Sequence, residues 1–137
     1  MRFETNKEKG RAGMALAIAY FGSNGYTISI PLNDTQWYDL VIEKEGIFQT
    51  VQCKATDTED NTIYLRSCGG HSTSVYDNVL DHPVDLLFCL DSKQHMFVIP
   101  VEDIRASGNL NSISLREAVS KFANKNSFDT SKYLVKI

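Results

Sequence analysis

Three polar residues in two neighbouring segments carry the groups that a metal-dependent hydrolase needs. Asp39 lies near the start of the apolar segment 38–42, and Gln52 and Lys54 alternate within the segment 47–55. Side chains of a β-strand alternate between its two faces, so Gln52 and Lys54 share one face, and Asp39 can stand beside them if the segments pair. Carboxylate and amide oxygens can hold Mg²⁺, and an ammonium group can orient a water and stabilise a charged transition state. The pattern therefore predicts a catalytic set of Asp39, Gln52 and Lys54, in which Asp39 and Gln52 bind the metal.

The same three residues also fit a solvent-exposed hairpin face that carries a cross-strand ion pair. A bare D…Q-x-K pattern recurs by chance in many sequences. The spacing alone leaves both interpretations open, and the surrounding elements have to decide between them.

A β-hairpin must position these residues. The segments 38–42 and 47–55 have the composition of strands and flank the turn 43–46, as in an antiparallel hairpin. The segment 7–21 is predicted to be a helix that is apolar almost all round, which favours burial on more than one side, under a sheet or against a second subunit.

The rest of the chain continues an α/β pattern. Ser114 could cap a helix that begins near Leu115, with Glu117 forming a weak capping box. The segment 67–82, rich in glycine and hydroxyl residues, is predicted to be a loop with one helical turn near 75–80. The other predicted strands are 26–30, 62–66 as a continuation of the hairpin, 85–90, 94–99 and an edge strand at 133–135.

Size and composition limit the classes of protein that are possible. The chain has 137 residues, 42% hydrophobic and 23% charged, which indicates one globular domain over residues 1–137. The longest apolar run has eight residues, too short to cross a membrane, and no signal-peptide pattern is present. Three cysteines without zinc-site spacing fit a reduced, cytoplasmic setting. The net charge of −3 argues against a general polyanion binder but not against a nuclease, because a metal-binding cleft needs carboxylates.

The order of these motifs resembles that of the PD-(D/E)XK endonucleases associated with group I introns, over roughly residues 7–105. Archaeal Holliday-junction resolvases are similar over a shorter part. The segments that carry the resemblance are Lys9-Gly10, 15–21, Gly25-Tyr26, 29–32, 38–42, 51–54, 83–86 and 97–103.

The resemblance implies a fold and an activity. The fold would be a restriction-endonuclease-like core, with a central mixed β-sheet flanked by helices. The activity would be Mg²⁺-dependent cleavage of double-stranded DNA by a homodimer or homotetramer. In that family the strand motif can read Gln-x-Lys in place of Glu-x-Lys, so Gln52 and Lys54 match the variant and Asp39 matches the aspartate that precedes it.

One position departs from the family pattern. Families of this kind often carry a glutamate on the first helix that faces the metal, and by spacing from Lys9-Gly10 that position is occupied by Met14. Glu8 lies six residues earlier, about 240° around the helix, so it cannot take the place of this glutamate. A DNA-binding module that keeps the nuclease fold with weakened or lost cleavage is therefore the second hypothesis, and an unrelated α/β interaction protein is the third.

Other polar and aromatic residues have mainly structural interpretations. His71 could contact phosphate or act as a base, but an isolated loop histidine is usually only solvated, and His82 and His95 show no metal-ligand spacing. Trp37 and Tyr38 could stack on a base but more often pack beside a turn. The remaining candidates are an acidic cluster expected to form a solvated turn (Asp57, Glu59, Asp60) and a basic cluster expected to form a solvated helix face (Lys7, Lys9, Arg11). The DNA-contacting residues are not predicted, although the stretch 66–81 is the first place to look.

Overall fold

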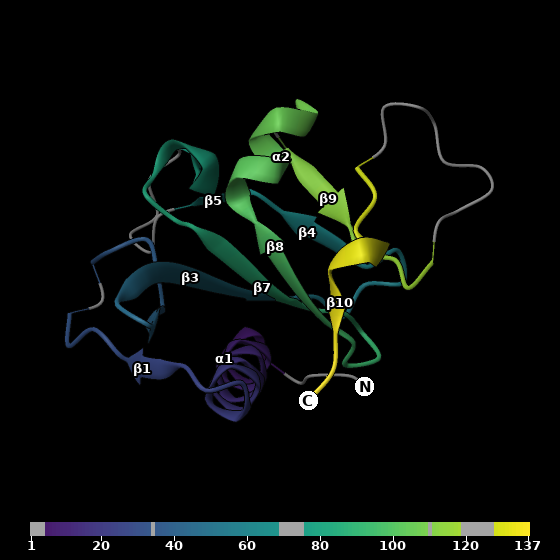
Figure 1. The fold of residues 1–137 in the computed structure, drawn as a ribbon. Helices are drawn as coiled ribbons and strands as arrows, with labels where there is room; N and C mark the ends of the chain where they lie inside the picture. Colours follow the sequence, from purple (N-terminus) through teal and green to yellow (C-terminus); the bar gives the residue numbers. More distant parts are fainter. Residues whose placement is uncertain (1–4, 34, 69–75, 110, 119–127) are drawn as a thin grey trace.

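A six-stranded mixed sheet forms the centre of the protein (Figure 1). The computed structural model describes residues 5–33, 35–68, 76–109, 111–118 and 128–137. Neighbouring strands are antiparallel except β3 and β7, which are parallel. In sheet order the strands are β1 (Thr27–Ser29), β2 (Leu40–Lys44), β3 (Ile47–Ala55), β7 (Leu86–Leu90), β8 (Met96–Pro100) and β10 (Leu134–Val135).

Helix α1 (Asn6–Ser23) covers one face of this sheet (Figure 1). The hydroxyl of Thr5 accepts a hydrogen bond from the Glu8 N–H at 3.1 Å, which caps the first turn. The buried residues Gly13, Ala17 and Phe21 recur every four residues and form one stripe on the helix. The apolar cluster between α1 and the sheet has a buried part formed by Ala17, Phe21, Leu40, Ile42, Val51, Leu86, Phe88, Leu90 and Met96.

The opposite face of the sheet packs against smaller elements (Figure 1). These are the two-stranded sheets β4 (Thr62–Tyr64) with β9 (Ser112–Ser114) and β5 (Arg66–Cys68) with β6 (Tyr76–Asn78), helix α2 (Val101–Ser107), and the 3₁₀ turns at Val79–Asp81 and Ser131–Tyr133. The second apolar cluster lies on this face, and its buried members are Ile63, Leu65, Val79, Leu80, Val84, Leu87, Cys89, Phe97, Ile99, Val101, Ile104, Ile113 and Leu115. The result is a mixed sheet with helices on both faces, as predicted.

Several predicted elements are confirmed with small shifts of their ends. The hairpin is formed by β2 and β3, the apolar run that starts at Asp85 becomes β7 with every residue buried, and the C-terminal segment is the edge strand β10. Within this chain α1 is buried on one side only, because Ile18 on its outer side is 36% exposed, so burial of a second side against another subunit stays a prediction.

Several features of the structure differ from the predictions. The strand after the hairpin does not continue the meander, because β4 pairs with β9. A helix does not begin near Leu115: Ser114 ends β9, and residues 115–118 are not helical. The Thr130 hydroxyl donates to the Ser114 carbonyl at 2.8 Å and accepts from the Arg116 N–H at 2.9 Å, so these backbone groups are satisfied without a helix. Residues 119–127 of that predicted helix lie outside the described residues.

The third difference is helix α2, which the sequence analysis missed. It follows Pro100, carries Glu102 and Asp103 in its first turn, and ends at Gly108 with a positive φ of 81°. Acidic residues in the first turn and a glycine after the last turn are helix-end signals. None of the helices in the described parts of the chain combines the length and hydrophobicity needed to span a bilayer.

Candidate active site

The hairpin of β2 and β3 brings Asp39 against the strand that carries Gln52 and Lys54. Leu40 pairs with Val51, so the residue before Leu40 stands opposite the residue after Val51. The Asp39 N–H donates to the Val51 carbonyl at 2.8 Å. One carboxylate oxygen of Asp39, Oδ2, accepts a hydrogen bond from the Cys53 N–H, also at 2.8 Å. Asp39 is therefore tied to the backbone between Gln52 and Lys54.

Strand β3 turns its polar residues away from helix α1. In the parallel pairing with β7, Gln52 lies beside Leu87 and Lys54 beside Cys89, and both of these neighbours belong to the cluster on the face opposite α1. The alternate residues of β3, Val51, Cys53 and Ala55, belong to the cluster under α1. The predicted alternation of polar and apolar faces is thus present in the structure.

Lys54 is a half-buried cation without a close counterion. Among the described residues, no hydrogen bond or ion pair to its ammonium group is found. Burial lowers the pKa of Lys54, and the nearby Cys89 and Asp39 oppose this shift. A desolvated ammonium group without an acceptor is unfavourable in the free protein and suited to an anionic ligand.

The pKa of the Asp39 carboxyl group is shifted in the direction opposite to that of Lys54. Burial raises its pKa above 3.8, while the Cys53 N–H and the charge of Lys54 pull the pKa in the opposite direction. Burial of a carboxylate beside a buried ammonium group is typical of functional centres, although structural ion pairs can produce it as well.

The oxygen donors present fit a hard cation such as Mg²⁺. Asp39 has one carboxylate oxygen, Oδ1, that does not accept the Cys53 hydrogen bond. Gln52 is half-buried, and no hydrogen bond among the described residues uses its side-chain amide. Mg²⁺ in proteins commonly keeps several waters and takes one or two carboxylates plus phosphate oxygens of the substrate. A site with few protein ligands is therefore compatible with this metal.

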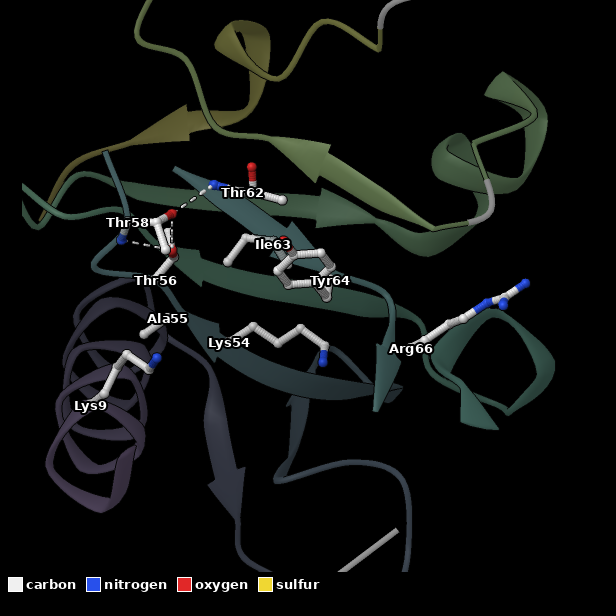
Figure 2. A pocket seen from close by; sticks show the side chains of 9 residues that line it. All are labelled: Lys9, Lys54, Ala55, Thr56, Thr58, Thr62, Ile63, Tyr64 and Arg66. Atoms are coloured by element: carbon white, nitrogen blue, oxygen red, sulfur yellow. Dashed lines mark hydrogen bonds between the residues drawn. The ribbon is translucent and has the colours of Figure 1, made fainter. Parts of the chain in front are cut away.

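A pocket of about 310 Å³ opens beside Lys54 (Figure 2). Its wall includes Lys54, Ala55 and Thr56 at the end of β3, and Thr58 from the following turn. The rest of the wall comes from Lys9 on α1, from Thr62, Ile63 and Tyr64 on β4, and from Arg66 on β5. The sequence analysis missed Tyr64, and it named Arg66 only as the first residue of the stretch 66–81 in which to look for DNA contacts. Only the packing of β4 and β5 beside β3 brings the two residues to Lys54.

Met14, at the expected position of the first-helix glutamate, is half-buried and packs against the cluster under α1. An ideal Cβ built on its neighbour Gly13 would lie 3.8 Å from the Ala55 Cβ, so this turn of α1 runs close to the end of β3. The methionine supplies no oxygen ligand there.

The members of the acidic cluster and of the basic cluster do not stay together in the structure. Lys9 forms an ion pair with Asp57 at 3.8 Å and lines the pocket, whereas Lys7 and Arg11 are exposed on other parts of α1. Asp60 accepts hydrogen bonds from the Thr58 hydroxyl at 2.7 Å and the Thr62 N–H at 3.3 Å, so it organises the turn before β4.

Among the described residues, the aromatic and histidine candidates do not line this pocket. Trp37 stacks on His82, with ring centroids 3.9 Å apart and planes 9° apart, and it packs against the second cluster, which supports its structural interpretation. His82 Nε2 lies 3.0 Å from Asp77 Oδ1. His71 lies outside the described residues.

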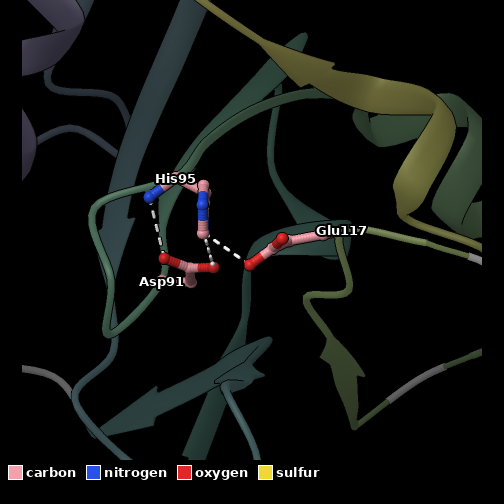
Figure 3. A group of neighbouring side chains, drawn as sticks. All are labelled: Asp91, His95 and Glu117. Carbon is pink, nitrogen blue, oxygen red and sulfur yellow. Dashed lines mark hydrogen bonds and ion pairs between the residues drawn. The ribbon is translucent and has the colours of Figure 1, made fainter.

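His95 joins a second group of possible ligands, and none of its members lines the pocket beside Lys54 (Figure 3). Its Nδ1 lies 2.8 Å from Asp91 Oδ2 and 3.1 Å from Glu117 Oε1, and the three ligand atoms lie within 4.8 Å of one another. Asp91 is buried, and its Oδ1 accepts from the N–H groups of Lys93 and His95. The sequence spacing gave no sign of this group, because Glu117 comes from a distant segment. Hydrogen bonding from one imidazole to two carboxylates is sufficient to explain the geometry.

Comparisons with known proteins agree with this architecture. No curated protein matches the chain. The solved structure of a bacterial homing endonuclease, I-Ssp6803I, has a similar fold, with a TM-score of 0.73 and 20% sequence identity. The match covers 95% of this chain and 88% of that chain. The family model described as PD-(D/E)XK endonuclease matches residues 4–134, nearly the whole sequence. The chain therefore belongs to the PD-(D/E)XK endonuclease family.

Proposed function

We propose that the chain is a Mg²⁺-dependent endonuclease that hydrolyses phosphodiester bonds in double-stranded DNA, in the manner of homing endonucleases. The observation that carries the proposal is the hydrogen bond from the Cys53 N–H to Asp39. It holds a carboxylate beside the strand positions of Gln52 and Lys54, where an ammonium group without a counterion borders an open pocket.

Each residue of the centre has a distinct role in this proposal. The Oδ1 of Asp39 and the side-chain oxygen of Gln52 hold Mg²⁺, which when bound polarises the phosphate and activates a water. Lys54 orients the attacking water and stabilises the negative charge that develops on the phosphate oxygens. Because Lys54 has no acceptor in the free protein, its interaction with the transition state replaces no protein hydrogen bond among the described residues.

A catalytically weakened or inactive DNA-binding module is the second candidate, and Met14 is the observation that favours it. The methionine provides packing where a metal ligand is expected. The half-buried pair of Asp39 and Lys54 counts against this alternative, because DNA binding alone does not require a desolvated carboxylate next to a desolvated ammonium group.

We also propose that the chain acts as a homodimer or homotetramer. Cutting both strands of a duplex in one binding event calls for two active centres, and closed symmetry supplies them. The outer side of α1 supports the proposal, because Ala15, Ile18 and Ala19 are exposed there.

The test is the appearance of new DNA ends in a library of random genomic fragments, so that the target sequence need not be known. The wild type is incubated with Mg²⁺ or with EDTA beside Asp39→Asn and the control Asp81→Asn, an exposed aspartate outside the pocket. Recurrent ends that require Mg²⁺ and disappear only in Asp39→Asn support the nuclease. Ends that persist in Asp39→Asn overturn the assigned centre. DNA binding without new ends favours the inactive module, and no binding at all contradicts both.

A further inference from the structure

The pocket beside Lys54 collects three cations from three separate elements. Lys9 comes from α1, Lys54 from β3 and Arg66 from β5, and all three line the same hollow. Figure 2 shows Lys9 and Arg66 toward opposite ends of the pocket, with Lys54 between them. The chain carries a net charge of −3, so this gathering of positive charge is local and does not reflect the overall composition.

The two outer cations are only weakly engaged in the free protein. Arg66 is exposed, and within the described parts of the chain its guanidinium makes no hydrogen bond or ion pair. Lys9 forms a single ion pair, with Asp57 at 3.8 Å, and both side chains are partly exposed, 25% and 30%. Ion pairs of this kind contribute little to stability. Neither cation is therefore held in place by a structural role that requires its charge.

The exposed aromatic side chain of the pocket suits a nucleic acid strand, whereas its two threonine hydroxyls are used within the protein. Thr58 donates its hydroxyl proton to Asp60 at 2.7 Å, and the Thr56 hydroxyl is hydrogen-bonded to the Thr58 hydroxyl at 2.9 Å. Tyr64 is 65% exposed on the same wall, which offers an aromatic surface to a sugar or base. Isolated surface lysines and arginines are usually only solvated, but here they border the pocket into which the reactive Lys54 extends.

We propose that Lys9 and Arg66 are positioning residues that bind phosphates of one DNA strand on either side of the phosphate held at Lys54. The inference rests on the proposed function and deepens it, because it states where the cleaved strand runs: from the first turns of α1, across the end of β3, to β5. The Asp57 carboxylate competes with DNA for Lys9 and repels the phosphate that Lys9 binds.

The first test measures how DNA affinity depends on salt. A phosphate contact that releases a counterion contributes about 0.9 to the slope of log K against log salt concentration. Binding of a short duplex is measured in EDTA over a series of KCl concentrations, so that no cleavage occurs. Lys9→Ala and Arg66→Ala should each reduce the slope by about 0.9, and the double variant by about 1.8.

Matched controls come from the same chain. Arg11→Ala removes a cation from the exposed surface of the same helix, two residues from Lys9, and Arg116→Ala removes an exposed arginine outside the pocket. Both controls should leave the slope within about 0.3 of the wild type. Arg66→Lys keeps a cation and should retain the wild-type slope, which separates loss of charge from loss of structure.

A second variant is predicted to gain affinity. Asp57→Asn removes the counterion of Lys9, so duplex binding should tighten several-fold at low salt, whereas Glu59→Gln, an exposed neighbour that does not line the pocket, should have a smaller effect. The gain should disappear when Asp57→Asn is combined with Lys9→Ala. A misfolded protein would not gain affinity, so this outcome does not depend on the stability of an alanine variant.

The outcomes separate this inference from the proposed function. If the wild type does not bind DNA, the proposed function fails and this inference fails with it. If the wild type binds and cleaves but Lys9→Ala and Arg66→Ala keep the wild-type slope, only the path of the strand is wrong. If Arg11→Ala and Arg116→Ala reduced the salt slope as much as Lys9→Ala and Arg66→Ala do, the inference would also be overturned. DNA affinity would then depend on the total charge of the protein and not on these two positions.

Discussion

The Asp39 carboxylate accepts a hydrogen bond from the Cys53 N–H at 2.8 Å, at the strand position between Gln52 and Lys54. This bond fixes one carboxylate oxygen and leaves Oδ1 for other ligands. It also explains how Asp39, just outside β2, remains in place although the ladder of the hairpin begins one residue later. The geometry of the proposed centre therefore depends on a main-chain donor, which no substitution at position 53 other than proline would remove.

Replacement of Lys54 should separate activity from stability. Burial lowers the pKa of Lys54, so its folded-state pKa lies below its unfolded value, and the charged form destabilises the folded protein at neutral pH. Lys54→Met should therefore reduce cleavage at least about 100-fold while raising the free energy of unfolding by about 1 kcal/mol. Cleavage rates and urea unfolding at pH 7 check the two effects. Lys136→Met, at an exposed position near the C-terminus, is the control and should change neither. A less stable but active Lys54→Met would contradict the role given to Lys54.

Mg²⁺ should stabilise the folded protein through Asp39. A ligand at 100 times its Kd adds about 2.7 kcal/mol to the free energy of unfolding, which corresponds to a rise in Tm of roughly 10 °C for a domain of this size. The wild type should show a saturable rise in Tm with Mg²⁺, and Asp39→Asn should lose most of it. His95→Ala, which removes the imidazole from the group of Asp91 and Glu117, should keep the Mg²⁺ effect. If His95→Ala abolished the rise in Tm with Mg²⁺ and Asp39→Asn kept it, the metal would bind at the group of Asp91, His95 and Glu117 and not at Asp39.

The stability of the metal-free protein should carry a pH signature of Asp39. Burial raises its folded-state pKa above 3.8, so the folded protein holds this proton more tightly than the unfolded chain does. Stability from this group is fully present below 3.8 and is lost as pH rises through the folded-state pKa. Asp39→Asn removes this dependence, so the variant should gain stability relative to the wild type as pH rises through that window. Urea unfolding of both proteins in EDTA measures the difference, and a difference that is constant with pH would show that Asp39 is not desolvated.

Met14→Glu should restore a missing metal ligand at the expense of packing. The carboxylate enters an apolar cluster, so the free energy of unfolding without metal should fall by about 1–3 kcal/mol. With Mg²⁺ present, part of this loss should be recovered and cleavage should increase. The control is Met14→Gln, which introduces a polar side chain of similar size without the charge. If Met14→Gln matches Met14→Glu in Mg²⁺ affinity and cleavage, position 14 does not contribute a carboxylate ligand.

The hairpin and its polar face could be predicted from the sequence because both depend on local patterns. The alternation along β3 and the position of Asp39 at the strand entrance are short-range features that the structure contains, and the turn predicted at 43–46 is present in a shorter form at residues 45–46. Asp85, in contrast, makes a long-range contact that the sequence pattern does not reveal. Its Oδ2 accepts from the Thr50 N–H at 2.8 Å, which fixes the parallel pairing of β3 and β7, but a contact across 35 residues leaves no trace in local spacing.

The pocket could not be predicted for the same reason. Lys9 and Arg66 are far apart in sequence and meet only because α1 and β5 border the end of β3. The prediction of a helix after Ser114 was wrong because Thr130 forms hydrogen bonds with the backbone at Ser114 and Arg116. This tertiary interaction overrides a weak capping signal.

The most direct test of the assigned centre is cleavage of a genomic fragment library in Mg²⁺ by four proteins. These are the wild type, Lys54→Ala, Met14→Glu, and Met14→Glu combined with Lys54→Ala. The account predicts recurrent DNA ends in the wild type, more of them in Met14→Glu, and none above background in either protein that carries Lys54→Ala. Ends of equal abundance with and without Lys54 in either background would contradict it.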